Sequence, residues 1–442
     1  MSYMNASKTN AGKSKMRASL AAGGTATRDV LPVESVWWEK IRVAARQLAA
    51  SYNFRRIETP LFERVEILAR GFGEREEVIG QELFLVRSRG GAAFAVRPEG
   101  TIPVLRAYLE HSLGRVSQPQ KLFFSGKVAP LRRSVPEGFR ELNEISFHIV
   151  GGTSDPVYDA QTALVFHHLL RALKIKGVFL KLNMVGCKVC TPFYRRQLQS
   201  YFGRHEKEMC VGCAEHVKVN PLRVFACRKE KCVAFHGNAP NILDRICSAC
   251  TQHLERSLEY VDELKVEYTL DSRWVGTKGY YSKIVFALAA LKNPAIPIAE
   301  GGRCDYLMEA LGGRVVSAVA GTTWCERLVA AMHGGELPKE APAHAGRRVF
   351  VVHVGDLAKR RTLELIESLR GAGVPADEAL GRESLRAQLK IAEREGYALA
   401  LIVGQREIYE GSVIVRDLRS SVQETIMTRD IAEEVKQRLK DA

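Results

Sequence analysis

Residues 121–151 read KLFFSGKVAPLRRSVPEGFRELNEISFHIVG and contain two apolar segments on either side of a basic loop. The apolar runs at 122–124 and 145–150 predict two strands joined as a β-hairpin. The loop between them carries Arg132, Arg133 and Arg140. Such a hairpin would hold positive charge over whatever lies on the face of its sheet, which makes it a candidate clamp for a phosphate.

A second strand end is predicted just upstream, where residues 94–101 read FAVRPEGT. The turn after this strand places Arg97, Glu99 and Thr101 close together. An arginine and a glutamate at two neighbouring strand ends suit an anionic nucleotide and an amino group. Taken alone, however, this motif is more often a turn whose charges are solvated.

Length and charge narrow the class of protein. The chain has 442 residues, which predicts two or three domains that each have a core. Its 65 basic and 50 acidic residues give a formal net charge of +15. This balance favours a polyanionic partner such as tRNA, DNA or an anionic surface, and a generally basic soluble protein is the alternative. No run of about 18 apolar residues is present, so we expect no transmembrane helix and no membrane partner.

Residues 1–26 are polar, basic and rich in small residues, which predicts a disordered tail. The segment lacks the apolar core of a secretory signal, and we therefore expect a cytoplasmic protein. A transit peptide is a weaker alternative, because such peptides are amphipathic and rich in Arg and Ser.

Antiparallel strands interleaved with helices are predicted around the hairpin, in residues 27–183 and again in 251–333. This order indicates an α+β domain rather than alternating βαβ units. Within it we expect a strand over 53–61, which Pro60 would confine to a sheet edge, and a tight turn at Gly301–Arg303.

The last quarter of the chain has a different pattern. Residues 334–346 are rich in Gly, Pro and Ala and predict a linker. Residues 347–442 alternate apolar strands with amphipathic helices, which predicts a separate α/β domain with a mixed sheet.

Eight of the ten cysteines fall within a predicted insertion at residues 184–250, as four close pairs: Cys187 with Cys190, Cys210 with Cys213, Cys227 with Cys232, and Cys247 with Cys250. A CxxC turn places two thiolates on one side of a metal, at about 2.3 Å each, and a second turn completes the tetrahedron. We expect structural zinc, because four thiolates leave no open position for water. Two closed sites, or one site with spare cysteines, are both compatible with the spacing. A redox pair and chance clustering are further alternatives.

A last candidate consists of Gly301, Gly302 and Arg303 together with Arg327. Glycines allow a ligand to approach the backbone closely, and an arginine can form two hydrogen bonds with a phosphate. Alone, this motif is more often structural.

The order of many short motifs is more specific than any one of them. They are TRDVLP, IETPLFERVEIL, ARGFGE, RPEGT, the hairpin, NPLRVFAC, GYYSKIVF, EGGRCDYLMEALGG and CERLV, followed by the predicted α/β domain. In this order they resemble bacterial histidyl-tRNA synthetases over residues 25–435. The resemblance implies a class II synthetase core with an antiparallel sheet and a homodimer formed around Pro60. It implies histidine, ATP with Mg and tRNA as substrates, and a C-terminal domain that binds the anticodon stem.

The resemblance also assigns residues to roles. Glu99 and Thr101 correspond to the residues that bind the substrate amino group, and Tyr280 and Tyr281 to the imidazole side of the pocket. Arg327 corresponds to the arginine that holds the terminal phosphates of ATP, and Gly301, Gly302 and Arg303 also match the substrate-binding pattern. Four basic residues of the C-terminal domain are candidate RNA contacts, with a solvated charged face as the alternative for each: Arg382, Arg386, Lys390 and Arg406.

Eight positions carry a residue other than the one that the resemblance predicts. Pro130 and Gly276 replace arginines, Arg132 and His148 replace glutamates, Glu144 replaces a glutamine, Cys304 a tyrosine and Trp324 a glycine, and in addition Gly279 replaces an aspartate. Loss of two groups that stabilise transition-state charge would cost about 6–8 kcal/mol if their effects add. Arg132 or Lys278 could supply a replacement charge, although a lysine lacks the planar fork of arginine.

The sequence therefore predicts one of two functions. The first is a histidine–tRNA ligase with an unusual site. The second is a non-catalytic, synthetase-like dimer that binds tRNA or a tRNA-like RNA, or regulates another enzyme.

Overall fold

The computed structural model describes residues 29–87, 90–131, 141–334 and 348–441, and contacts divide the chain into two units. One unit consists mainly of residues 37–338 and the other mainly of residues 339–442. The predicted basic tail, the linker and the arginines of the hairpin loop lie outside the described residues. Among the described helices, none is long and apolar enough to cross a membrane.

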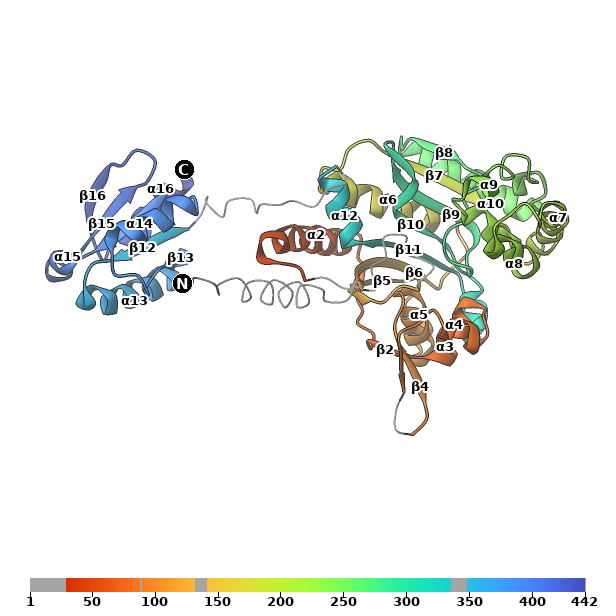
Figure 1. Cartoon of the computed structure of the whole chain (residues 1–442), viewed down its shortest axis with the longest axis horizontal. Helices are drawn as coiled ribbons and strands as arrows, with labels where there is room; N and C mark the ends of the chain where they lie inside the picture. Colours follow the sequence, from red (N-terminus) through yellow and green to blue (C-terminus); the bar gives the residue numbers. More distant parts are fainter. Residues whose placement is uncertain (1–28, 88–89, 132–140, 335–347, 442) are drawn as a thin grey trace, which may run out of the picture. The chain divides into compact units, whose positions relative to one another are not determined.

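The first unit is organised around an eight-stranded sheet (Figure 1). Its strands, in spatial order, are β1 (Arg55–Arg56), β5 (Gln120–Val128), β6 (Leu142–Val150), β11 (Ala318–Trp324), β10 (Asn293–Arg303), β9 (Ser282–Ala290), β7 (Val178–Met184) and β8 (Tyr268–Leu270). All neighbouring pairs are antiparallel except those at the two edges, β1 with β5 and β7 with β8. The predicted hairpin is β5 and β6, with Phe123 paired to Phe147, so the α+β prediction is confirmed.

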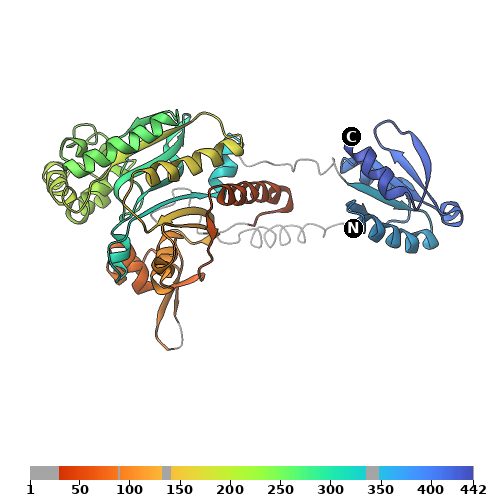
Figure 2. The ribbon, with the colours of Figure 1, turned by 180° about the vertical axis from the view of Figure 1, so that it is seen from behind.

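Helices cover one face of this sheet, and Figure 2 shows them on its near side. They are α2 (Pro32–Ser51), α6 (Val157–Ala172), α10 (Ser248–Glu263) and α12 (Cys325–Met332). Alternate residues of the strands point toward them, and Phe147, Phe166 and Phe286 stack edge to face or tilted in the shared core.

The opposite face is only partly covered. Helices α3 (Val65–Phe72), α4 (Glu76–Gly80), α5 (Thr101–Glu110) and α11 (Leu307–Ala310), the short helix η1 (Leu113–Arg115) and a three-stranded sheet of β2 (Phe62–Arg64), β4 (Ala93–Val96) and β3 (Leu85–Arg87) belong to this side. Their apolar residues form a second core with the sheet. Buried polar residues, among them Glu144 and His148 of β6, also lie on this side of the sheet.

One element prediction was right only in part, and another was wrong. The strand expected at 53–61 lies at a sheet edge as predicted, but it pairs only at Arg55 and Arg56, and the carbonyls of Thr59 and Pro60 accept from Arg97 instead. Gly301–Arg303 is not a turn but the end of β10, paired on both sides with β9 and β11.

The insertion between β7 and β8 has a small core of its own. It contains α7 (Thr191–Arg204), α8 (Val211–Val219), η3 (Pro221–Ala226), α9 (Glu230–Val233) and η4 (Ile242–Asp244), and it ends in α10. Tyr194, Leu198 and Phe202 of α7 pack against Val224 and Phe225. This core is too small to stabilise the segment well by itself.

The second unit is built on a five-stranded mixed sheet, as the sequence predicts. Its strands are β13 (Ala376–Glu378), β12 (Val349–His353), β14 (Leu399–Val403), β15 (Ser412–Asp417) and β16 (Gln423–Met427), and the first three are parallel. Its helices are α13 (Asp356–Gly371), α14 (Leu385–Arg394), α15 (Gln405–Glu410) and α16 (Ile431–Asp441). Helix α15 and strand β16 were not predicted.

Candidate active site

A buried cluster of polar side chains lies where β4 turns into α5. Glu99 is 1% exposed, and its Oε1 accepts a 2.7 Å hydrogen bond from the backbone N–H of Ile102. Its Oε2 accepts from the Tyr280 hydroxyl and lies 3.5 Å from Nζ of Lys278. The cluster thus combines the carboxylate of Glu99 with the phenol of Tyr280 and the ammonium group of Lys278, which lie about 180 residues further along the chain.

Two side chains of β6 point to the same face of the sheet. Oε1 of Glu144 accepts from the backbone N–H of Gly100 at 2.9 Å, whereas Oε2 has no hydrogen bond from any described residue. Burial, together with the nearby charge of Glu99, raises the pKa of Glu144 to about 7. At neutral pH this carboxyl is therefore close to half protonated, and its protonated form can donate a hydrogen bond as the amide of a glutamine does.

His148 is fully buried, and its Nε2 lies 3.4 Å from Oγ1 of Thr101. Its Nδ1 lies 3.4 Å from the carbonyl of Leu122. Burial lowers the pKa of His148 to about 4, so the ring is neutral at physiological pH. A neutral ring stands where the family resemblance predicts a carboxylate.

The backbone excludes a side chain at one of the replaced arginine positions. Gly276 has φ of +74°, and a Cβ there would come within 2.5 Å of the Tyr281 ring. Two residues later, Lys278 is only 9% exposed and directs its ammonium group to Glu99. The ammonium group of Lys278 therefore lies beside Glu99, where the sequence analysis considered it as a replacement charge.

Apolar side chains fill the neighbouring part of the same face. Trp324, at the end of β11, is paired with Glu144 of β6 and is 8% exposed. It packs in one cluster with Val104, Leu122, Phe124, Val128 and Leu142. The guanidinium of Arg327 lies 4.2 Å from the centre of the Trp324 ring and donates to the carbonyl of Pro297. The indole therefore covers the face of the arginine that the resemblance assigns to ATP.

Pro130 follows β5 and is buried. It contributes neither an N–H nor a charge. Arg132, the second considered replacement, lies outside the described residues. Along the described part of the hairpin, no arginine stands over the sheet.

Other predicted site residues have structural partners. Arg303 is 0% exposed and forms ion pairs with Asp159 at 2.6 Å and Asp305 at 3.3 Å, so it joins β10 to α6 instead of facing a ligand. A Cβ on Gly301 would lie 2.5 Å from the carbonyl of Ala320, which explains the glycine by sheet packing. Cys304 is fully buried beside this network.

Gly302 is equally confined, since a Cβ there would lie 2.8 Å from the carbonyl of Ile284. Arg97 is also buried and bonds to Thr59 and to the carbonyl of Lys127, so the interpretation of RPEGT as a solvated turn was wrong.

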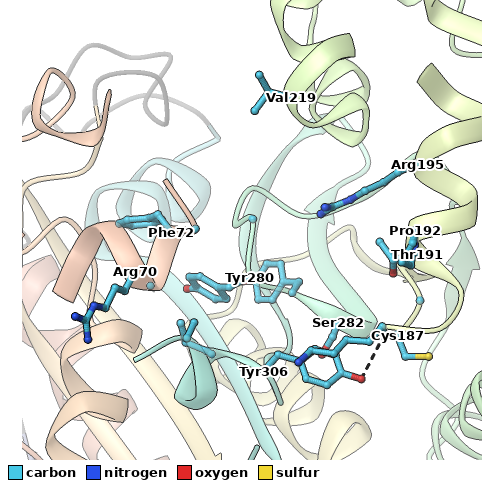
Figure 3. A pocket seen from close by; sticks show the side chains of 18 of the residues that line it. Arg70, Phe72, Cys187, Thr191, Pro192, Arg195, Val219, Tyr280, Ser282 and Tyr306 are labelled. Carbon is cyan, nitrogen blue, oxygen red and sulfur yellow. Dashed lines mark hydrogen bonds between the residues drawn. The ribbon is translucent and has the colours of Figure 1, made fainter. Parts of the chain in front are cut away.

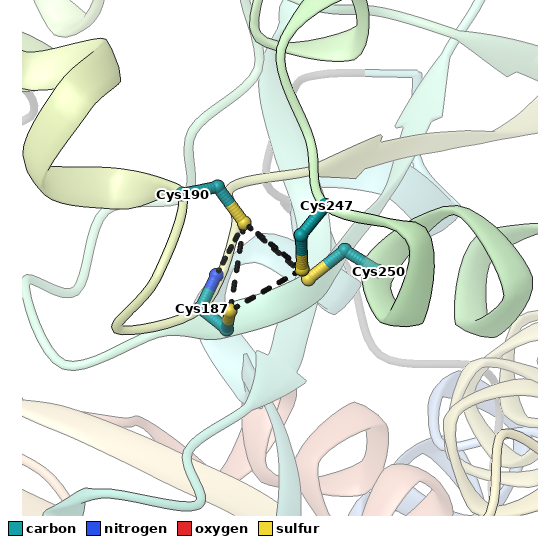
Figure 4. A group of neighbouring side chains, drawn as sticks. All are labelled: Cys187, Cys190, Cys247 and Cys250. Carbon is teal, nitrogen blue, oxygen red and sulfur yellow. Dashed lines mark hydrogen bonds between the residues drawn. The ribbon is translucent and has the colours of Figure 1, made fainter.

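The eight cysteines form two separate groups of four. Cys187, Cys190, Cys247 and Cys250 make up the first group (Figure 4), and Cys210, Cys213, Cys227 and Cys232 the second. Within each group the Sγ atoms lie within 4.8 Å of one another. In the first group four Sγ–Sγ distances are 3.5, 3.6, 3.7 and 3.8 Å. The edge of a tetrahedron with zinc–sulfur bonds of about 2.3 Å is about 3.8 Å, so this group fits a tetrahedral metal.

In the second unit, the four candidate RNA contacts are all exposed. Arg386 and Lys390 lie one turn apart on α14, and Arg382 precedes that helix. Arg406 pairs with Glu410 at 2.8 Å, although it remains 82% exposed.

Sequence reasoning did not single out two buried or partly buried polar groups. Glu300 is 6% exposed and accepts from Thr277, and the Nε–H of Arg195 donates to none of the described residues. Neither belongs to a recognisable motif, so only the fold reveals their positions.

Comparisons with known proteins are consistent across the chain. Residues 26–189 match the family model described as histidyl-tRNA synthetase, and residues 348–438 match an anticodon binding domain. A histidine–tRNA ligase of Pelotomaculum thermopropionicum is 32% identical over 93% of this chain and 97% of its own length. One of Desulforudis audaxviator is 33% identical with the same coverage. The apo crystal structure of Staphylococcus aureus histidyl-tRNA synthetase matches with a TM-score of 0.76 and 26% identity, over 93% of this chain and 98% of that one.

Proposed function

The chain belongs to the histidyl-tRNA synthetase family, and we propose that it binds histidine in the pocket around Glu99 and uses ATP with Mg to attach it to a tRNA. The arrangement of Glu99, Tyr280 and Lys278 carries this proposal. A buried carboxylate beside a phenol suits the ammonium group of an amino acid, and Thr101 and Tyr281 complete the pocket.

Lys278 is proposed to supply the positive charge that Gly276 lacks. Its ammonium group would face the carboxylate of the amino acid and the charge that develops during activation. Because a lysine is a point charge without the fork of an arginine, we expect activation slower than with an arginine. Arg327 would contribute to ATP binding when the Trp324 ring moves from its face.

The test is histidine-dependent exchange of pyrophosphate into ATP by the full-length protein. We expect exchange, and a fall of about 10²–10³ for Lys278→Ala. Lys292→Ala is the matched control, since Lys292 is exposed in the turn between β9 and β10. Absence of exchange in a protein that still binds tRNA would rule out catalysis.

A second candidate is a non-catalytic protein that binds tRNA, and the Trp324 cluster favours it. An indole packed on Arg327, in a cluster of apolar side chains, leaves this part of the sheet face apolar. In this case tRNA would bind without exchange activity, so the same experiment separates the two candidates.

Both four-cysteine groups are proposed to hold zinc. The first would join the end of β7 to the start of α10, and the second would fold the middle of the insertion. Their donor sets consist entirely of sulfur, which suits a closed structural site. Cysteines stay reduced in the cytoplasm, and we therefore propose that the protein acts there. From the family resemblance we also propose that it acts as a homodimer.

A further inference from the structure

An ion pair joins the insertion to the loop after α3. Nη2 of Arg223, in η3, lies 2.5 Å from Oε1 of Glu74, and the two side chains are 28% and 11% exposed. A fully exposed ion pair contributes little, whereas removal of one partner from a shielded pair leaves the other charge uncompensated. The pair therefore ties together two parts of the fold that are 149 residues apart in the sequence.

Each partner is held by a fixed backbone. Gly73 follows α3 with φ of +66°, and the N–H of the glutamate after it donates back to the helix at 3.0 Å. On the other side, Val224 and Phe225 of η3 are buried in the core of the insertion. Cys227, of the second cysteine group, immediately follows η3. The two charges are thus presented by preformed elements, which favours one defined geometry.

The backbone between Lys278 and Tyr280 lies against this ion pair. A Cβ built on Gly279 would be 3.8 Å from Nη2 of Arg223, an ordinary contact distance. The two neighbours of this glycine both reach Glu99, Lys278 through its ammonium group at 3.5 Å and Tyr280 through its hydroxyl. One residue therefore links the ion pair to two side chains of the proposed pocket.

A cleft of about 540 Å³ adjoins the same contact. Gly73 and Gly279, which lie next to the ion pair, both line it. Figure 3 shows Phe72 of α3 on one side of the cleft and Arg195 of the insertion on the other. Because open space replaces side-chain packing here, the position of the segment depends strongly on the polar contacts at its rim.

The insertion also holds this segment further upstream. Arg273 donates to the carbonyls of Pro240 at 3.2 Å and Gly237 at 2.8 Å. Val275 packs against the core of the insertion. The insertion thus contacts the segment on both sides of residue 276, before the chain reaches the pocket.

Starting from the proposed function of the pocket, we propose that Arg223 is a positioning residue for it. The ion pair with Glu74 holds the backbone at residue 279 so that Lys278 and Tyr280 reach their carboxylate partner. The insertion then supports histidine binding without touching the substrate. Loss of the pair lowers the fraction of molecules with a formed pocket, and the apparent affinity falls by that fraction, whereas saturating histidine restores the formed state.

The reactivity of the Lys278 amine tests the positioning without any need for catalysis. The full-length protein is acetylated with N-hydroxysuccinimidyl acetate, and mass spectrometry gives the rate at each lysine. We expect Arg223→Ala to raise the rate at Lys278 at least about tenfold, because the segment opens more often. Lys283 on β9, which is 20% exposed, should keep its rate and so reports general loosening. Lys218→Ala is the matched control, since it removes an ion pair within the insertion.

Variants of the partner show whether the two charges act together. Glu74→Gln should raise the rate at Lys278 as Arg223→Ala does, and the double variant should raise it no further. Arg223→Lys, which retains the charge, should give an intermediate rate and serves if the alanine variant does not fold.

Histidine-dependent pyrophosphate exchange measures the consequence for the reaction. In Arg223→Ala the KM for histidine should rise about tenfold, whereas kcat should change less than about twofold. Equal rates at Lys278 in the unmodified protein and in Arg223→Ala would overturn the proposal, as would equal acceleration at Lys278 and Lys283. If Lys278 responds as expected but even the unmodified protein shows no exchange, the positioning role stands and the proposed reaction is wrong.

Discussion

Among single residues, Glu144 is expected to make the free energy of unfolding depend on pH, because burial raises its pKa. Its pKa is 4.5 when exposed and about 7 when folded, so between these values the folded state keeps a proton that the unfolded state loses. The free energy of unfolding must therefore fall as pH rises through this window. The difference between the two pKa values corresponds to about 3 kcal/mol.

We expect Glu144→Gln to remove this loss, because glutamine retains the hydrogen bond from Gly100 without a charge. Urea unfolding of both proteins from pH 5 to pH 8 measures the effect. Their difference in free energy of unfolding should favour the glutamine variant increasingly above pH 5 and level off above about pH 7. A constant difference across the range would show that Glu144 ionises normally.

At the scale of elements, Trp324 is the part of β11 that bears most directly on ATP. We expect Trp324→Ala to strengthen ATP binding, because it exposes the Arg327 guanidinium that the indole now covers. The variant should also lose about 3–5 kcal/mol of stability, as large-to-small changes in a core do. Equilibrium binding of ATP and urea unfolding check the two effects separately.

Leu142→Ala is the matched control for this prediction. Leu142 belongs to the same apolar cluster, so its loss should destabilise the protein, but the ring that covers Arg327 is that of Trp324. Equal strengthening of ATP binding by both variants would point to general loosening of the cluster instead of removal of a cover.

The two four-cysteine groups of the insertion are expected to hold one zinc ion each. Metal analysis of protein purified without chelator should find two zinc ions per chain, and Cys213→Ser and Cys250→Ser should each remove one, because the two groups share no ligand. Cys325→Ser, outside both groups, should retain both ions. A metal-free protein that folds normally would contradict the structural role.

Some features of these elements could be predicted from the sequence, and others could not. The hairpin, the cysteine pairs and the α/β unit follow from local periodicity and spacing, and they were predicted. The grouping of Cys187 with Cys247 rather than with Cys210 depends on how β7 and α10 meet, which spacing does not encode. Similarly, Arg303 is buried against Asp159, which lies 144 residues away in the sequence, so local patterns could not reveal this ion pair. A turn was wrongly predicted at Gly301–Arg303 because glycines are common in turns, whereas here Gly301 and Gly302 allow close packing of neighbouring strands.

At the scale of the whole molecule, the net charge of +15 favours binding of a polyanion, and the exposed cations of the second unit are the proposed contacts. Each phosphate neutralised contributes about 0.7–0.9 to the slope of log affinity against log salt. We expect tRNA binding to weaken steeply with salt. Replacing Arg386 and Lys390 together by alanine should reduce that slope by about 2.

Filter binding of tRNA between about 50 and 200 mM salt measures this slope. Arg361→Ala on α13 is the control, since Arg361 is equally exposed but already pairs with Glu364 at 2.7 Å. The two-residue variant should fold normally, because both side chains point to solvent from α14 and neither is in the apolar core. If its slope equals that of the control, the basic face of α14 is only solvated, and the contacts that hold tRNA must come from other basic residues of the chain.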